Sequence, residues 1–223
     1  MRTLINLSIA AILMDGCAMV NVVPSIPQQL ANVVSITPQE GEYCSGWVLK
    51  GSHTVVTAAH CSPDDMTSVI NVDFGDGVNH PFHIQYLGKD TEGGAHLPDL
   101  MTLTTNDDSI KWPVGFEVCK FEPYYGEALQ LMGGPLGRSK TVSWGHVSNP
   151  NRDVSSEDPD YGSYIQYDGA MFPGNSGGPA IDMEHGCVMG SSDFMQPMHV
   201  GSVPIPVGLN FLTPMSQLKE ILK

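Results

Sequence analysis

Basic residues are scarce in this chain of 223 residues. Ten Lys and Arg stand against 24 Asp and Glu, which gives a formal net charge of -14 at pH 7. A nucleic-acid partner needs a basic surface, so this balance argues against one. Only 15% of the residues are charged and 41% are hydrophobic, which excludes the composition of a disordered chain. We expect a folded protein whose core needs neither a metal nor a cofactor.

No apolar run at the N-terminus is long enough to cross a membrane. The run from Leu4 to Met14 covers 11 residues, whereas a spanning helix needs about 20. It follows one positive charge at Arg2 and precedes the small residues Gly16 and Ala18. This pattern predicts a secretory signal peptide.

Residues 13–17 also resemble a bacterial lipobox, in which the cysteine, here Cys17, is acylated and becomes the new N-terminus. Asp15 departs from the small residue usual there, so cleavage near Ala18 or a buried N-terminal helix are the alternatives. We expect an exported protein, periplasmic or on the cell surface, with membrane attachment through lipidated Cys17. Residues 18–30 are expected to be an unstructured tether.

Closely spaced cysteine pairs are absent. The five cysteines are Cys17, Cys44, Cys61, Cys119 and Cys187. None of their spacings matches the Cys-x-x-Cys pattern of structural zinc sites, so zinc binding is disfavoured. If the first carries a lipid, four remain for disulfides in an exported compartment, and three connectivities are open.

Long helical patterns are also rare, whereas turn residues are abundant. The chain holds 24 Gly and 17 Pro, which together make up about 18% of its residues, against a usual share of about 12%. Short apolar runs between turn residues predict an all-β protein. The expected strands form two series separated by a break at 106–113: 31–36, 46–49, 55–59, 68–74 and 82–87, then 127–132, 141–147, 164–167, 180–182, 187–191 and 207–211.

Two further segments have their own patterns. The polar, acidic residues 149–161 are expected to form a solvated loop. Residues 213–222 predict a short C-terminal amphipathic helix, with Thr213 as its cap and Pro214 at its first position.

Three segments carry residue types suited to nucleophilic catalysis. They are 57–61, 98–103 and 173–179. A serine is a weak nucleophile, so Ser176 needs a base such as His60, and His60 needs a carboxylate such as Asp99 on its other nitrogen. Glycines around Ser176 allow a sharp turn that points the amides of Gly174 and Ser176 at one oxyanion. The set predicts acyl transfer.

A metal loop is the alternative use of the remaining histidines. His80 and His83 lie near Asp73 and Asp76. The ligand pattern of a calcium loop is missing, so we interpret Asp76-Gly77 as a hairpin turn and expect no metal site.

The order His60, Asp99, Ser176 with these flanks resembles the trypsin-like (chymotrypsin-fold) serine protease superfamily. More narrowly, the segments 134–148, 173–176 and 208–214 resemble HtrA/DegP-type protease domains, and the similarity extends from about Cys44 to Leu222. The resemblance implies two six-stranded antiparallel β-barrels, 31–114 and 115–223, the second with the C-terminal helix.

The resemblance also implies the function. We expect an exported serine endopeptidase that cleaves protein or peptide substrates without a cofactor, its active site lying in the cleft between the barrels. The alternative is a surface lipoprotein of the same fold that binds peptides or partners without catalysis. The oligomeric state stays open.

Three departures from the patterns of these related proteases are visible. The chain stops where the protease domain ends, so PDZ domains are not expected. Cys44 and Cys61 resemble the disulfide of chymotrypsin-like enzymes and bracket an expected hairpin, so we pair them, and Cys119 with Cys187 by elimination. Asn175 stands where chymotrypsin-type zymogens carry an Asp, so activation by N-terminal insertion is not expected.

In this superfamily, the pocket for the side chain before the scissile bond has its floor six residues before the nucleophile. That position is Ala170, followed by Met171 and Phe172. An apolar floor offers no partner for Lys or Arg. We therefore expect small to medium apolar side chains in the pocket.

The resemblance places the opposite wall of the pocket at Ser192, Asp193 and Phe194. Asp193 is expected to point outward and to solvate the rim. Ser191 or Ser192 is expected to support Asp99, and Phe194 to form an apolar wall.

Overall fold

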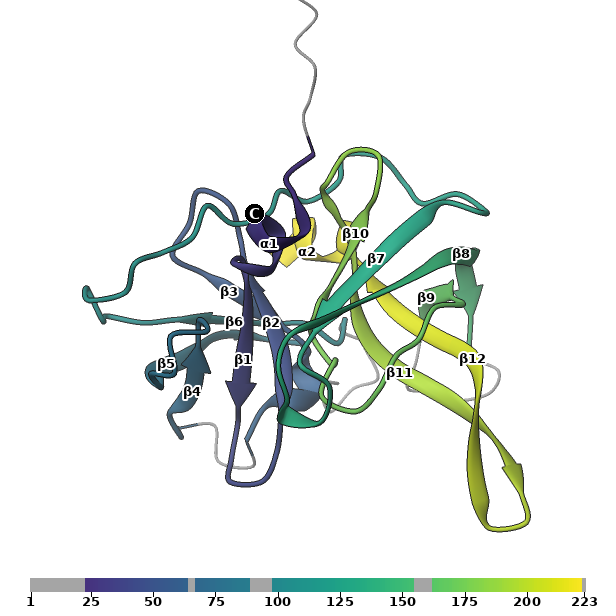
Figure 1. The fold of residues 1–223 in the computed structure, drawn as a ribbon, viewed down its shortest axis with the longest axis horizontal. Coiled ribbons are helices and arrows are strands. Elements are labelled where there is room, and N and C mark those ends of the chain that lie inside the picture. The colour runs from purple at the N-terminus through teal and green to yellow at the C-terminus, as the bar shows by residue number, and fades with distance from the viewer. Residues whose placement is uncertain (1–22, 64–66, 89–97, 155–161, 222–223) are drawn as a thin grey trace, which may run out of the picture.

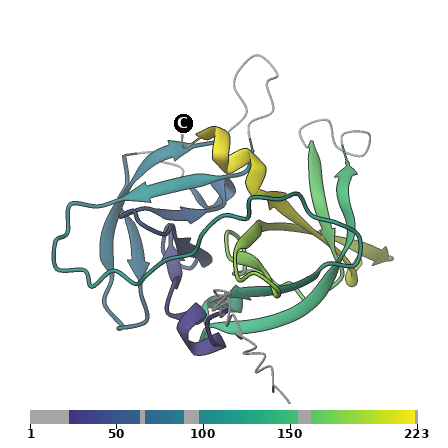
Figure 2. The same ribbon diagram turned by 90° about the horizontal axis from the view of Figure 1, so that it is seen from above.

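Two closed β-barrels of six antiparallel strands each make up the computed structural model. It describes residues 23–63, 67–88, 98–154 and 162–221. Figures 1 and 2 show the barrels side by side, joined by the extended segment 105–127. The predicted all-β double barrel is confirmed. The segment that we expected to be a signal peptide with a lipobox at Cys17 lies outside the described residues.

The first barrel has the strand order β1-β2-β3-β6-β5-β4. Its strands are β1 (Val33–Thr37), β2 (Cys44–Val48), β3 (Val55–Thr57), β4 (Ile70–Asp73), β5 (His80–Leu87) and β6 (Met101–Thr104). The second barrel has the order β10-β11-β12-β9-β8-β7. Its strands are β7 (Ala128–Gly133), β8 (Thr141–Asp153), β9 (Ser163–Tyr167), β10 (Pro179–Asp182), β11 (Val188–Val200) and β12 (Val203–Pro214).

Each barrel encloses its own apolar core, and a third apolar cluster joins the barrels. In that cluster Trp47 and Val56 of the first barrel pack with Met132 of the second. Met215 and Leu218 of the C-terminal helix α2 (Met215–Ile221) complete it. The predicted helix therefore lies over the seam, where its apolar face is buried. It begins at Met215, and Thr213 and Pro214, which we expected as its cap and first residue, belong to β12 instead. Within the described residues, no helix is long and apolar enough to cross a membrane.

Residues 26–30 do not form the unstructured tether that we expected. They form the short helix α1 (Ile26–Leu30), which begins with a capping box between Ser25 and Gln28. Gln29 is buried, donates to the Pro24 carbonyl oxygen at 2.7 Å and accepts from Gln130 of β7. The helix is thus anchored to the second barrel, and the prediction is wrong for this stretch.

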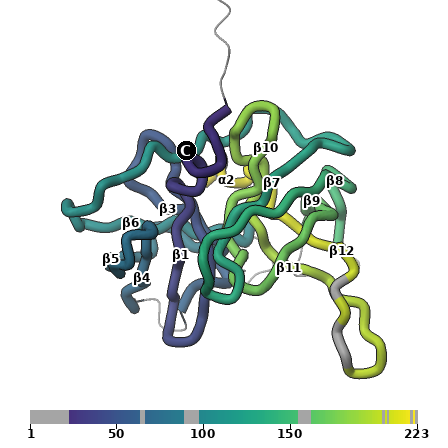
Figure 3. Tube along the Cα trace, in the orientation of Figure 1, coloured from purple at the N-terminus to yellow at the C-terminus, as the bar shows by residue number. Residues whose placement is uncertain are grey.

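β8, β11 and β12 extend well beyond the predicted ranges. β8 continues through residues 149–153, which we expected in a loop, whereas 155–161 lie outside the described residues. β11 and β12 extend beyond the barrel as a two-stranded hairpin (Figures 1 and 3). In this hairpin Pro197 is paired with Pro206. The expected strands stopped at residue 191 and began at residue 207, so they left out this hairpin, whose prolines are unusual within strands.

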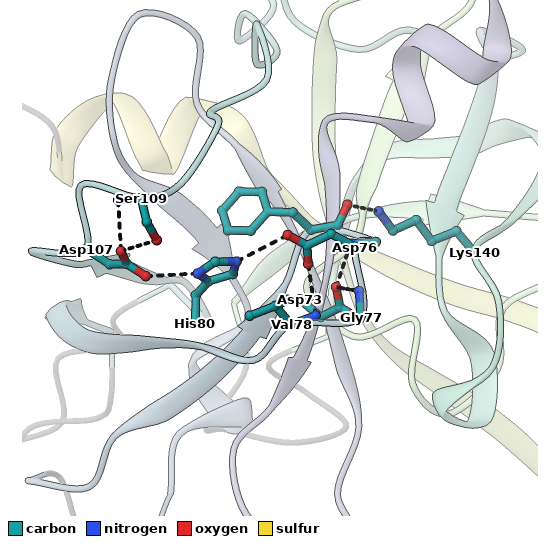
Figure 4. Close-up of polar contacts among 10 residues, drawn as sticks. Asp73, Asp76, Gly77, Val78, His80, Asp107, Ser109 and Lys140 are labelled. Atoms are coloured by element: carbon teal, nitrogen blue, oxygen red, sulfur yellow. Dashed lines mark hydrogen bonds and ion pairs between the residues drawn. The ribbon is translucent and has the colours of Figure 1, made fainter.

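A hydrogen-bonded hairpin occupies the turn between β4 and β5 (Figure 4). Asp73 Oδ1 accepts from the amides of Gly75 at 2.6 Å and Gly77 at 3.2 Å, and Asp76 Oδ1 accepts from Val78 at 3.0 Å. His80 places Nδ1 2.9 Å from Asp107 and Nε2 3.4 Å from Asp76. The hairpin-turn interpretation of Asp76-Gly77 is confirmed.

The His80 contacts predict a pH-dependent contribution to stability. The hydrogen bond to Asp107 outweighs burial and, with Asp76, raises the pKa of His80. Hydrogen bonds from Ser109 and His80 hold the pKa of Asp107 at about 2, so that carboxylate stays ionised. A raised folded-state pKa stabilises fully below the unfolded value of about 6.5, and this stabilisation is lost as pH rises through the folded-state pKa.

We therefore expect His80→Asn to lower the free energy of unfolding more at pH 5.5 than at pH 8.5. Urea denaturation at both pH values measures this difference. The exposed His83, substituted in the same way, is the control and should show no such difference. An equal loss at both pH values in His80→Asn would contradict the role of the charged imidazole.

Candidate active site

His60 and Asp99 lie close together at one end of the paired strands β3 and β6 of the first barrel. His60 lies in the 3-10 helix η1 (Ala59–Cys61) after β3, and Asp99 lies just before β6. Thr57 pairs with Met101, which brings the two segments together. His60 Nδ1 lies 2.7 Å from Asp99 Oδ2, and the His60 amide donates to Asp99 Oδ1 at 2.7 Å.

This double contact sets the role of each ring nitrogen. With Nδ1–H donated to the carboxylate, Nε2 of His60 is left as an acceptor. Burial by itself raises the pKa of Asp99, but the hydrogen bonds and charge of His60, with a hydrogen bond from Asp193, hold that pKa below its ordinary value. Asp99 is therefore an anion at neutral pH.

The loop that carries Ser176 packs directly against the segment that carries His60. The Ser45 amide donates to the Ser176 carbonyl oxygen at 2.8 Å, and Cys61 Sγ lies 4.0 Å from the same oxygen. Gly177 has a φ of +81°, and a Cβ there would lie 2.2 Å from Thr57 Oγ1. Only glycine fits this position, so Ser176 is held beside the end of β3.

The amides of Gly174 and Ser176 are available to a ligand oxygen. Among the described residues, no hydrogen bond has either amide as its donor. The Leu136 amide donates to the Pro173 carbonyl oxygen at 2.8 Å. Since a trans peptide points its C=O and N–H in opposite directions, this bond turns the Gly174 N–H away from Leu136. Ser45 Oγ donates to the Gly174 carbonyl oxygen at 2.7 Å and fixes the next peptide.

The backbone of Leu136, which the sequence analysis did not consider, lies next to the loop of Ser176. It lies in the 3-10 turn η2 (Pro135–Gly137) and has a φ of 56°, the only positive value of a non-glycine residue in the described part of the chain. Such a backbone costs energy and is often found at functional sites. Here it points the amide that orients the Pro173–Gly174 peptide.

The disulfides have the predicted connectivity, Cys44–Cys61 and Cys119–Cys187. Cys44–Cys61 closes a loop with a sequence separation of 17 and ties β2 to η1, next to His60. We expect Cys44→Ala with Cys61→Ala to lower the free energy of unfolding by about 3 kcal/mol in the chain-entropy model. Urea denaturation checks this.

Reductant should lower the free energy of unfolding less in the doubly substituted protein than in the parent protein, because only the bridge Cys119–Cys187 is left to be reduced. A free energy of unfolding that is equal to that of the parent protein would contradict a stabilising role of the bridge.

We expected Asp193 to point outward, and this prediction is wrong. Asp193 is only 6% exposed. Its Oδ2 accepts a hydrogen bond from Thr213 Oγ1 at 2.8 Å, and its Oδ1 lies 3.7 Å from His60 Nδ1. The side chain therefore lies against the His60–Asp99 pair. A β-bulge between Ser192 and Met195 interrupts the alternation of β11, and a bulge cannot be read from the alternation pattern.

The supporting role expected of the serines is also wrong. Ser192 Oγ donates to the Asn175 carbonyl oxygen. Ser191 Oγ is buried and has no hydrogen-bond partner among the described residues. Neither reaches Asp99, which instead contacts Asp193.

The other predicted pocket residues have different surroundings. Ala170 and Phe172 are exposed, whereas Met171 is buried in the core of the second barrel. Phe194 stacks on Phe211 with ring centroids 4.6 Å apart. Asn210, which the sequence analysis did not consider, donates to the Gly169 carbonyl oxygen at 2.6 Å next to Ala170.

The sequence is similar to those of known peptidases. A trypsin-like peptidase domain matches residues 44–190. Protease Do-like 8, chloroplastic, of Arabidopsis thaliana is 30% identical over 165 residues, 69% of this chain and 35% of that protein. The probable periplasmic serine endoprotease DegP-like of Brucella suis biovar 1 is 29% identical over 178 residues, 80% of this chain and 32% of that protein.

Solved structures show the same fold. The serine endoprotease from Yersinia pestis superposes with a TM-score of 0.64 at 20% identity, covering 90% of this chain and 66% of that one. The chain spans about a third of the length of the curated relatives named above.

Proposed function

The chain belongs to the trypsin-like peptidase family, and we propose that it is a serine endopeptidase whose triad is Ser176, His60 and Asp99. The observation that carries this proposal is the contact of 2.7 Å between His60 Nδ1 and Asp99 Oδ2 beside the loop of Ser176. A carboxylate on Nδ1 and a free Nε2 are what a histidine needs to act as a base.

In the proposed reaction, His60 Nε2 takes the proton of Ser176 Oγ as that oxygen attacks the peptide carbonyl carbon. The negative charge that develops on the substrate oxygen is stabilised by the N–H groups of Gly174 and Ser176. His60 then gives the proton to the leaving amine, which breaks the peptide bond and leaves an acyl-enzyme. A water molecule releases the acyl group by the same steps, so none of them requires a cofactor.

Two further parts of the proposal concern location. Disulfides persist in oxidising compartments, so Cys44–Cys61 and Cys119–Cys187 support an exported protein. The Brucella relative is named periplasmic. We infer export to the periplasm or the cell surface, with protein or peptide substrates, and a lipid on Cys17 as the anchor.

Acyl-enzyme formation is tested by mixing the purified protein with an excess of a p-nitrophenyl ester. A serine peptidase should release a burst of about one equivalent of nitrophenol before a slower steady state. A folded protein that shows neither a burst nor turnover of peptides would contradict the proposal and favour a binding protein.

The expected specificity follows from the position of Asp193. Since its carboxylate lies against His60 and Asp99, it offers no partner to a basic side chain in the pocket, and the floor at Ala170 is apolar. We expect kcat/KM to be about 10²-fold higher for Val than for Arg before the scissile bond, because an unpaired buried cation is costly.

Paired peptide substrates that differ only at this residue measure the ratio. Asp193→Ala provides the control for the pocket assignment. A preference for Arg that disappears in Asp193→Ala would show that the carboxylate lines the pocket after all.

A further inference from the structure

Asp193 is a buried carboxyl group for which the triad chemistry has no role. Its side chain is 4% exposed. The polar and titratable groups that face it among the described residues come from four elements: His60 of η1, Asp99 before β6, Tyr164 of β9 and Thr213 of β12. No cationic Lys or Arg is among them, so a charge on Asp193 would have no permanent counterion.

The carboxyl groups of Asp99 and Asp193 share one small volume with the imidazole. One ligand atom from each of His60, Asp99 and Asp193 lies within 4.8 Å of the others. Two carboxylates so close together do not both ionise readily, because each charge disfavours the other. A proton between them removes this repulsion and makes one group a hydrogen-bond donor.

We propose that Asp193 is a protonated positioning residue, which donates a hydrogen bond to the Asp99 carboxylate and thereby keeps a single negative charge beside His60. This inference rests on the proposed protease function. Burial, the charge of Asp99 and the hydrogen bond with Asp99 together raise the pKa of Asp193 well above its ordinary value. The same hydrogen bond contributes to the lowered pKa of Asp99.

The contacts of the two oxygens assign the proton to one side of the group. Oδ2 accepts from Thr213 Oγ1 at 2.8 Å, so it serves as an acceptor. Oδ1 faces the His60–Asp99 pair and is left to carry the proton. Tyr164 also hydrogen-bonds to the Asp193 carboxyl group. Asparagine can reproduce these bonds, since its oxygen can accept from Thr213 and Tyr164 and its NH₂ can donate to Asp99. Asp193→Asn therefore mimics the protonated acid and cannot ionise.

The pH dependence of kcat/KM separates the protonated from the ionised group. We expect the acid limb of the profile to have the same midpoint, within about 0.3 pH unit, in the parent protein and in Asp193→Asn. If Asp193 were a second anion 3.7 Å from Nδ1, its removal would move this limb to lower pH by about 3 pH units at an effective dielectric constant near 20. Such a shift would overturn the proposal.

Asp193→Ala serves as the matched variant without a donor. We expect its kcat to fall about tenfold with KM unchanged, while Asp193→Asn keeps most of the activity. A merely space-filling role would instead predict that Asp193→Leu, which fills a similar volume without a donor, is as active as Asp193→Asn. Complete loss of activity on treatment with EDTA would show a divalent cation, rather than a proton, between the carboxylates.

Infrared difference spectroscopy detects the proton on the Asp193 carboxyl group and does not depend on an activity assay. The parent protein at pH 7 should show the C=O band of a protonated carboxylic acid that is missing in Asp193→Asn and shifts in D₂O. If Asp193→Asn does not fold, the D₂O-sensitive band is measured in Glu127→Gln, because the pKa of the buried Glu127 is raised to about 7 and that group gives an acid band of its own. A protein with the band but no peptide hydrolysis would contradict the protease function only, and an active protein without the band would contradict only the role of Asp193.

Discussion

Replacing Ser176 by alanine is expected to lower kcat by about 10⁶, and His60→Ala by a similar factor. The two side chains act as one unit, because the Ser176 hydroxyl is nucleophilic only while His60 Nε2 accepts its proton. The double variant should therefore be scarcely worse than either single one. Steady-state hydrolysis of a peptide with Val before the scissile bond measures all three proteins.

Matched controls are available on the surface. Ser139 and His83 are exposed, and their alanine variants should keep full activity. More than a tenth of the parent activity in Ser176→Ala would refute the assignment of the nucleophile. Losses that multiply in the double variant would refute the claim that Ser176 and His60 act together.

Asp99→Asn is expected to lower kcat by about 10⁴ while leaving the fold intact. An asparagine NH₂ opposite Nδ1 favours the tautomer with its proton on Nε2, which can no longer accept from Ser176. Asp193 does not replace the lost carboxylate, because its Oδ1 is 3.7 Å from Nδ1 and thus beyond hydrogen-bond distance.

The measurement is kcat together with a thermal unfolding curve for each protein. Asp108→Asn, at an exposed acidic residue, is the control and should not change kcat. A loss below about tenfold in Asp99→Asn would contradict the role of Asp99 as the partner of His60.

The all-β class was predictable because its signals are local, whereas the double barrel was implied by the family resemblance and β6 was not among the expected strands. Short apolar runs between turn residues mark the strands, and the flanks of His60, Asp99 and Ser176 give the order of the site. The pairing of Cys44 with Cys61 follows from the same local hairpin.

The remaining features depend on contacts between distant segments. A β-bulge turns Asp193 toward Asp99, and no alternation of the sequence reveals it. The backbone of Leu136 becomes meaningful only when Pro173, far along the chain, accepts its amide. The hairpin of β11 and β12 pairs Pro197 with Pro206 beyond the apolar runs that marked the two strands, so the pattern of apolar runs did not include it.

Labelling with a fluorophosphonate probe tests the central claim most directly, because the probe reacts only with a serine that a neighbouring base activates. Intact mass and peptide mapping of the folded protein should show one equivalent of probe, attached to Ser176. Ser176→Ala should take up none, and His60→Ala should react far more slowly. A folded parent protein that stays unlabelled, or that carries the probe on another residue, would contradict the account.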